Sequence, residues 1–126
     1  LSVKRELIDA AFADALARMR NMPADQKRAF LKGLLLAASG VGETLIPDDN
    51  ERALYDEAFM NSLNAALEKA GKPPVTLSPD GRKLGGGFIL KSGGLEINCT
   101  YESVLAQARP GMEAEVAQRL FGQRGD

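Results

Sequence analysis

The sequence predicts an α+β fold, in which amphipathic helices pack on a small sheet of four strands that is mostly antiparallel or mixed. Two long segments in the first forty residues repeat apolar residues at three- and four-residue steps, which is the period of an amphipathic helix. The run from Leu84 to Gly122 predicts a β-hairpin that continues directly into another helix. The predicted order is helix, helix, strand, helix, three strands and helix, which fits a group of neighbouring strands covered by helices.

Four helices are expected from the apolar spacing, over residues 3–20, from Pro23 to Gly40, over 51–70, and from about Tyr101 onward. Pro23 suits the first turn of a helix because its fixed φ and missing N–H cost nothing there. Gly71 suits a helix C-terminus. Pro110 interrupts the last helix, for which we predict a kink or a short break between two helical pieces.

Strands are expected at residues 43–47, 75–77, 88–91 and 95–100, with a tight turn at Gly93-Gly94 between the last two. In the last strand Leu95, Ile97 and Cys99 alternate with polar residues, which predicts one apolar face against the core. We therefore expect the substitution Ile97→Asp to bury an unpaired charge, at a cost of about 3 to 5 kcal/mol in the free energy of unfolding.

Length and composition predict a single globular domain over residues 1–126, with 44% hydrophobic residues available for one core. The chain has 16 basic and 17 acidic residues without a basic cluster, so we expect neither nucleic acid nor direct membrane insertion. Its single cysteine, Cys99, excludes an internal disulfide and suggests a reducing compartment. Its place on the apolar side of a strand favours a small buried hydrophobe over a reactive thiol.

The residue inventory argues against chemistry, because the chain lacks histidine, the commonest metal ligand and general base near neutral pH. We predict no catalytic residues, no metal site and no cofactor. Asp48, Asp49 and Glu51 could be taken for a cation site, but they lack the alternating spacing of a calcium loop. Capping of the following helix is the favoured interpretation.

Three consecutive glycines, Gly85 to Gly87, leave two interpretations open. Their backbone N–H groups could cradle a phosphate or another anion, which would make this a small-ligand or nucleotide-binding regulatory domain. However, they precede a strand and no Gly-Lys-Ser or Gly-Lys-Thr follows them, as a phosphate loop would require. Close packing or positive φ at a strand entry is the simpler explanation.

The hairpin and last helix together resemble the C-terminal signature of the E subunit of the rotary V-type and archaeal A-type ATPases. The residues on which this resemblance depends are Gly86, Gly87, Phe88 to Leu90, Gly93, Gly94, Leu95 to Asn98 including Ile97, Thr100, Tyr101, Glu102, Leu120, Phe121 and Gly122. Cys99 departs from the polar residue expected at its position. The resemblance covers nearly the whole chain, although only its last third is specific.

The resemblance implies a non-catalytic peripheral-stalk protein, the stator of a rotary motor, which anchors the stalk to the catalytic head. Its implied partners are a stalk subunit of the G or H type, paired as a coiled coil, and the non-catalytic B subunit of the head. It also implies a cytoplasmic, peripheral place in a membrane-bound complex, and a stalk helix upstream of Leu1. Leu1, Val3 and Arg5 are the candidate contacts to the partner helix. A stator of an export apparatus is a further possibility of the same kind.

Overall fold

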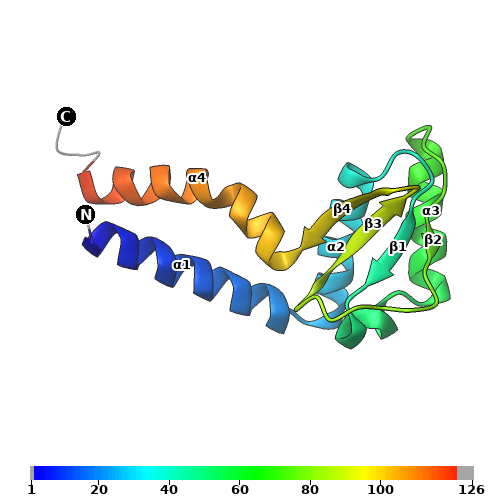
Figure 1. Ribbon diagram of the computed structural model, residues 1–126, viewed down its shortest axis with the longest axis horizontal. Coiled ribbons are helices and arrows are strands. Elements are labelled where there is room, and N and C mark those ends of the chain that lie inside the picture. The colour runs from blue at the N-terminus through cyan, green and yellow to red at the C-terminus, as the bar shows by residue number, and fades with distance from the viewer. Residues whose placement is uncertain (1, 122–126) are drawn as a thin grey trace.

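The computed structural model describes residues 2–121. Its elements in chain order are α1 (Ser2–Asn21), α2 (Ala24–Ala38), β1 (Thr44–Pro47), the 3-10 helix η1 (Asp49–Leu54), α3 (Glu57–Lys69), β2 (Thr76–Leu77), β3 (Gly87–Ser92), β4 (Leu95–Thr100) and α4 (Tyr101–Phe121). Figure 1 shows α1 and α4 running side by side away from the sheet. We call these two helices the arm, and residues 24–100 the body.

The four strands form one mixed sheet in the order β2-β1-β3-β4. β1 pairs with β2 in parallel, whereas the β1–β3 and β3–β4 pairs are antiparallel. A two-residue turn, Gly93-Gly94, joins β3 to β4, and Ser92 pairs with Leu95 across it. The predicted α+β class and mixed four-stranded sheet are therefore confirmed.

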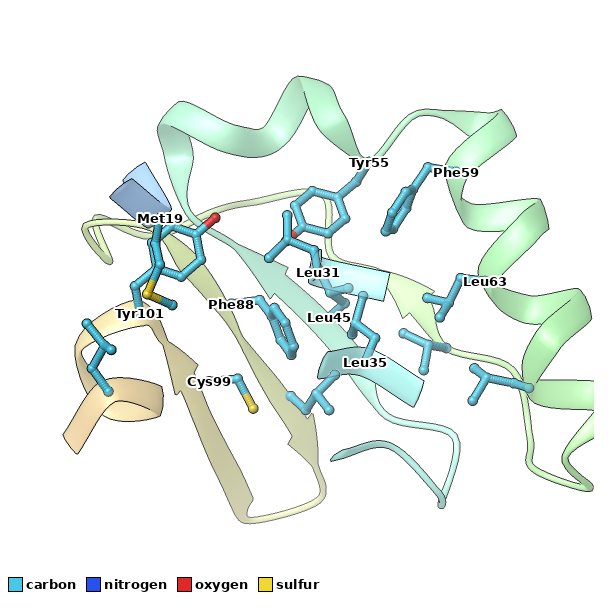
Figure 2. Close-up of a cluster of buried hydrophobic side chains, with 14 residues drawn as sticks. Met19, Leu31, Leu35, Leu45, Tyr55, Phe59, Leu63, Phe88, Cys99 and Tyr101 are labelled. Carbon is cyan, nitrogen blue, oxygen red and sulfur yellow. The ribbon is translucent and has the colours of Figure 1, made fainter. Parts of the chain in front are cut away.

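The core of the body lies between the sheet and the two helices α2 and α3, which cover the same face (Figure 1). Figure 2 shows leucines from both helices meeting the side chains of the two central strands. Leu31, Leu35 and Leu63 from the helices and Leu45 and Phe88 from the strands are fully buried. Burying a side chain of this size stabilises the fold by about 1.5–3 kcal/mol, so this layer is the main source of stability.

The helix predicted over residues 51–70 is wrong in one respect, because the structure divides it into η1 and α3. Asp48 caps η1 by accepting from Asn50 N at 3.1 Å, and Asp56 caps α3 by accepting from Phe59 N at 2.8 Å. A side chain that satisfies the first free N–H groups starts a new helix wherever it occurs. The break also lets Tyr55 and Phe59 pack edge to face in the core, with ring centroids 5.3 Å apart.

The last helix continues through Pro110, so the predicted kink or short break takes the form of one bent helix. α4 is continuous from Tyr101 to Phe121, and Figure 1 shows it bending between its first turns and its straight outer part. Proline removes one backbone hydrogen bond and crowds the preceding turn, which bends a helix without ending it.

The predicted burial of Ile97 is wrong. Ile97 pairs with Leu90, and directly opposite side chains point to the same face, so the predicted facing agrees with the register. Yet Leu90 is fully buried, whereas Ile97 is 44% and Leu95 76% exposed. β4 is an edge strand with a neighbour on one side only, which leaves its outer half uncovered. Of the three alternating residues, Cys99 alone is buried.

Candidate functional site

The arm is held together where α1 and α4 face each other. Ile8 is buried beside Arg109, and the Arg109 guanidinium carbon lies 5.6 Å from the centroid of the Phe12 ring. Arg109 Nη2 also donates to Asp9 Oδ1 at 2.6 Å. Because the ion pair is exposed to solvent, it contributes little to stability. Apolar contacts therefore hold the two helices side by side.

The outer side of α1 presents apolar side chains to solvent. Val3 is 63% and Leu7 43% exposed, and Arg5 is also exposed. Leu1 lies outside the described residues. The structure thus leaves Val3 accessible on this side, whereas Arg5, also exposed, lies beside Ile8 and Arg109 on the side of α1 that faces α4. The predicted contact of both residues with a partner helix stays a prediction.

At the base of the arm, the glycine run leads into β3 and packs closely against the junction between β4 and α4. Gly86 and Gly87 have φ values of 106° and 90°, a region that favours glycine. A Cβ on Gly86 would overlap the Tyr101 ring, and one on Gly87 would lie 2.8 Å from Thr100 Cα. The glycines therefore have both properties that the simpler explanation of the run requires, which are positive φ and close approach to neighbouring atoms.

Two of the backbone N–H groups of the glycine run, those of Gly85 and Gly87, already have acceptors within the protein. Leu84 N and Gly85 N donate to Asp48 Oδ1 at 2.8 and 3.1 Å, and Gly87 N donates to Glu51 Oε1 at 2.8 Å. The cleft at this place, of about 380 Å³, is lined by both carboxylates. An incoming phosphate would meet the cations Arg20 and Lys27 as well as these carboxylates, but the donors of Gly85 and Gly87 are already used. The occupied backbone donors argue against the anion-binding alternative.

One buried carboxylate connects four elements at the base of the arm. Glu51 Oε2 accepts from the Tyr101 hydroxyl at 2.7 Å and lies 3.0 Å from Lys27 Nζ. Lys27 Nζ also donates to the Arg20 carbonyl at 2.7 Å. Glu51 is 6%, Lys27 9% and Tyr101 0% exposed. We call Lys27, Glu51 and Tyr101 the joint.

The environment keeps the Tyr101 hydroxyl in its donor form. Burial, and then the hydrogen bond to Glu51, raise the pKa of Tyr101 far above its ordinary value. The ring lies over Gly86 and packs against Phe30 at a centroid distance of 6.1 Å. Buried ion pairs need further hydrogen bonds to offset the loss of water. The Tyr101 hydroxyl and the Gly87 N–H supply these bonds to Glu51.

The other residues of the family signature do not take part in the joint. Asn98 Oδ1 accepts from Thr100 N at 2.9 Å, and Thr100 Oγ1 accepts from Ser103 N at 3.2 Å, as expected of the predicted helix cap. Glu102 is exposed, with its carboxylate 3.8 Å from Arg20 Nη2. Ile97 lies away from the joint, on the open half of β4. Leu120 and Phe121 end α4, and their side chains lie outside the described residues.

Sequence reasoning missed the joint. Glu51 was expected only as a capping residue, Tyr101 only as the start of a helix and a member of the family signature, and Lys27 had no predicted role. One signal was available: Lys27 lies four and eight residues before Leu31 and Leu35, on the same buried side of α2. A lysine in a buried stripe needs an acidic partner.

The described part of the chain shows no metal site, no membrane-spanning helix and no activated cysteine. Within residues 2–121, no three His, Cys, Asp or Glu side chains come together as a metal site. None of the helices in this range is long and apolar enough to span a membrane. The Cys99 thiol is 8% exposed, and burial raises its pKa, which is unfavourable for a reactive thiolate.

Comparison with known proteins gives the same family that the sequence motif suggested. No protein-family model matches the chain. The V-type proton ATPase E subunit of Clostridium botulinum (strain Loch Maree / Type A3) is 32% identical over 123 residues, and that of Thermoanaerobacter pseudethanolicus is 35% identical over 123 residues. The V-type ATP synthase E subunit of Clostridium perfringens (strain SM101 / Type A) is 30% identical over the same length.

Each of these alignments covers 96% of this chain and 62% of the relative. The chain therefore spans somewhat less than two thirds of the length of the curated relatives it matches. Similarity along nearly all of this chain, together with the agreement of several relatives in name, leaves little room for a chance match. Along 96% of its length, the chain is a homologue of the V-type ATPase E subunits.

Proposed function

We propose that this chain is the C-terminal domain of a peripheral-stalk subunit in a rotary V-type ATPase, and that it anchors the stalk to the catalytic head. The homology to the E subunit is the observation on which this proposal depends. The shape supports it, because a stator must transmit force between a stiff helical element and a packed body. Here α1 and α4 project from the body and are tied to it by a buried network.

We assign the arm to the stalk side of this protein. Val3 and Leu7 are exposed on the side of α1 turned away from α4, while Ile8 is buried toward α4. A second apolar side on a helix that already packs on one neighbour is typical of a helix with two partners. The proposed partner is a helical stalk subunit of the G or H type, with Leu1, Val3 and Arg5 among its contacts.

We assign the body to contact with the non-catalytic B subunit of the head, without chemistry of its own. The two carboxylates that line the cleft at the base of the arm, on Asp48 and Glu51, both accept hydrogen bonds from backbone N–H groups. Such carboxylates serve structure and are poorly placed for proton transfer. The proposed location is cytoplasmic, in the peripheral part of the membrane-bound complex.

The experiment is co-purification of the full natural chain with its stalk partner and head subunits. The double substitution Val3→Asp and Leu7→Asp adds two charges to the outer side of α1, and should abolish capture of the stalk partner. The matched control, Ala58→Asp with Ala65→Asp, adds the same charge to exposed positions of α3 and should not change it. Failure of the unmodified chain to bind both a helical partner and the head would contradict the proposal.

A further inference from the structure

The arm is joined to the body at two points of the chain, and each is a possible hinge. α1 leads into α2 through Met22 and Pro23, and β4 leads directly into α4 at Tyr101. Hinges are usually a few residues at the ends of elements that absorb a change in φ and ψ. Without further contacts, α1 and α4 could swing together about these two connections.

Through Glu51, the joint contacts both of these connections from a third segment of the chain. Glu51 belongs to η1, which is part of neither connection. Its Oε2 accepts from Tyr101, the first residue of α4, at 2.7 Å. It also lies 3.0 Å from Lys27 Nζ, which donates to the carbonyl of Arg20, in the last turn of α1. One carboxylate thereby holds the ends of both arm helices.

The other polar contacts around the base are more exposed. Arg20 Nε donates to the Gly85 carbonyl at 2.8 Å, and its Nη2 lies 3.8 Å from Glu102. Both are exposed to solvent, where such pairs contribute little. The bonds of the joint are shielded from water and are correspondingly stronger. Met19 of α1 and Leu105 of α4 also lie in the buried apolar cluster of the body. Apolar contacts are non-directional, so the direction of the arm should depend mainly on the hydrogen bonds of the joint.

We propose that the Lys27–Glu51–Tyr101 joint fixes the direction of the α1–α4 arm relative to the body. When its hydrogen bonds are removed, the arm swings about its two chain connections while the core of the body stays folded. The proposal concerns the molecule itself and does not depend on the stator function proposed above.

The test measures the distance between the arm and the body by pulsed electron spin resonance in the full natural chain. Spin labels are placed at Ala11→Cys on α1 and Ala65→Cys on α3, both exposed, with Cys99→Ala removing the native thiol. The test variants are Tyr101→Phe, which removes the hydroxyl bond to Glu51, and Lys27→Met, which removes the link to α1. Amide hydrogen exchange of Leu45 and Leu63 reports whether the core stays closed.

Tyr55→Phe is the matched control. Tyr55 is a second buried tyrosine close to Glu51, and among the described residues its hydroxyl has no hydrogen-bond partner. The Tyr55→Phe variant loses the same oxygen atom as Tyr101→Phe, but it loses no hydrogen bond to Glu51.

The expected result is a distance distribution about twofold broader in either test variant, with core amides that lose no more protection than the fall in the free energy of unfolding accounts for. If Lys27→Met does not fold, Tyr101→Phe decides alone. A width equal to that of Tyr55→Phe overturns the proposal. Broadening with a larger loss of protection at Leu45 and Leu63 than the fall in the free energy of unfolding accounts for overturns it as well, because it reports general loosening of the body.

Discussion

The two ends of β4 have opposite characters, although they are only a few residues apart. At its C-terminal end, Cys99 and Thr100 are buried and lead into the joint at Tyr101. At its other end, Leu95 and Ile97 are largely exposed beside the hairpin turn. Polar groups are thus buried at one end, while apolar groups are exposed at the other.

This contrast shows that the pattern of a strand and its burial are set by different causes. Alternation of polar and apolar residues determines which face a side chain takes. Burial depends on what lies above that face and beside the strand. The base of the arm is covered by Phe30 and the glycine run, whereas the outer half of β4 is the open edge of the sheet.

The largest expected effect comes from adding a methyl group at the base of the arm. Gly86→Ala should lower the free energy of unfolding by about 3 kcal/mol or more, because the residue has positive φ and its Cβ would overlap the buried Tyr101 ring. Gly94→Ala is the control at the hairpin end, where a Cβ meets nothing within 4 Å, and should change stability by no more than about 0.5 kcal/mol. Urea denaturation of both variants measures the difference, and similar losses would show that the base is less tightly packed than described.

The second prediction compares two buried tyrosines. Tyr101→Phe removes a hydrogen bond to a buried carboxylate, and should cost about 2 kcal/mol in the free energy of unfolding. Tyr55→Phe removes a hydroxyl that has no partner among the described residues, and should be neutral or slightly stabilising. Thermal and urea unfolding of the pair would contradict this account if the two substitutions proved equally costly.

Much of the fold was predictable, because helices and strands follow from local periodicity. The helix predicted over residues 3–20 lies within one residue of the end of α1, and Thr100 caps α4 as expected. The errors arose where a local signal competed with that periodicity. Asp56 starts a new helix inside an apolar repeat, and its role as a cap depends on the turn made by the residues before it.

The joint could not be predicted as a whole, because its members come from distant parts of the chain. Lys27, Glu51 and Tyr101 are separated by 24 and 50 residues in sequence, and only the tertiary fold brings them together. Composition and spacing indicated the glycine run and the buried side of α2. They offered no means of choosing which carboxylate would pair with Lys27, since several acidic residues lie in between.

The hairpin end has a buried carboxylate of its own, which predicts acid sensitivity there. Glu43, next to the first residue of β1, accepts from Gly40 N and Val41 N at 3.1 Å each. Burial acts to raise the pKa of Glu43, but these backbone bonds and nearby Lys72 outweigh it and lower the pKa. A lowered folded pKa stabilises the fold above the ordinary pKa, and this contribution is lost as pH falls through the folded value.

Glu43→Gln should therefore cost about 1.5 kcal/mol near pH 7. The difference between the variant and the unmodified protein should shrink as pH falls below the ordinary pKa of 4.5, where the unfolded chain binds a proton at Glu43 before the folded protein does. Denaturant unfolding followed from pH 7 to pH 3 measures this difference. A difference that stays constant over the whole range would mean that the ionised form of Glu43 gives no special stability to the loop.

The smallest expected effect is at Ile97, where the sequence alone predicted a large one. Because Ile97 is 44% exposed on an edge strand, Ile97→Asp should cost about 1 kcal/mol or less, mainly from the lower strand propensity of aspartate. Leu90→Asp, at the directly opposite position, should unfold the protein, since it places a charge in the fully buried core. Melting temperatures of the two variants decide the question: a large loss at Ile97 would mean that the open half of β4 is covered in solution, and would restore the burial inferred from the alternating pattern.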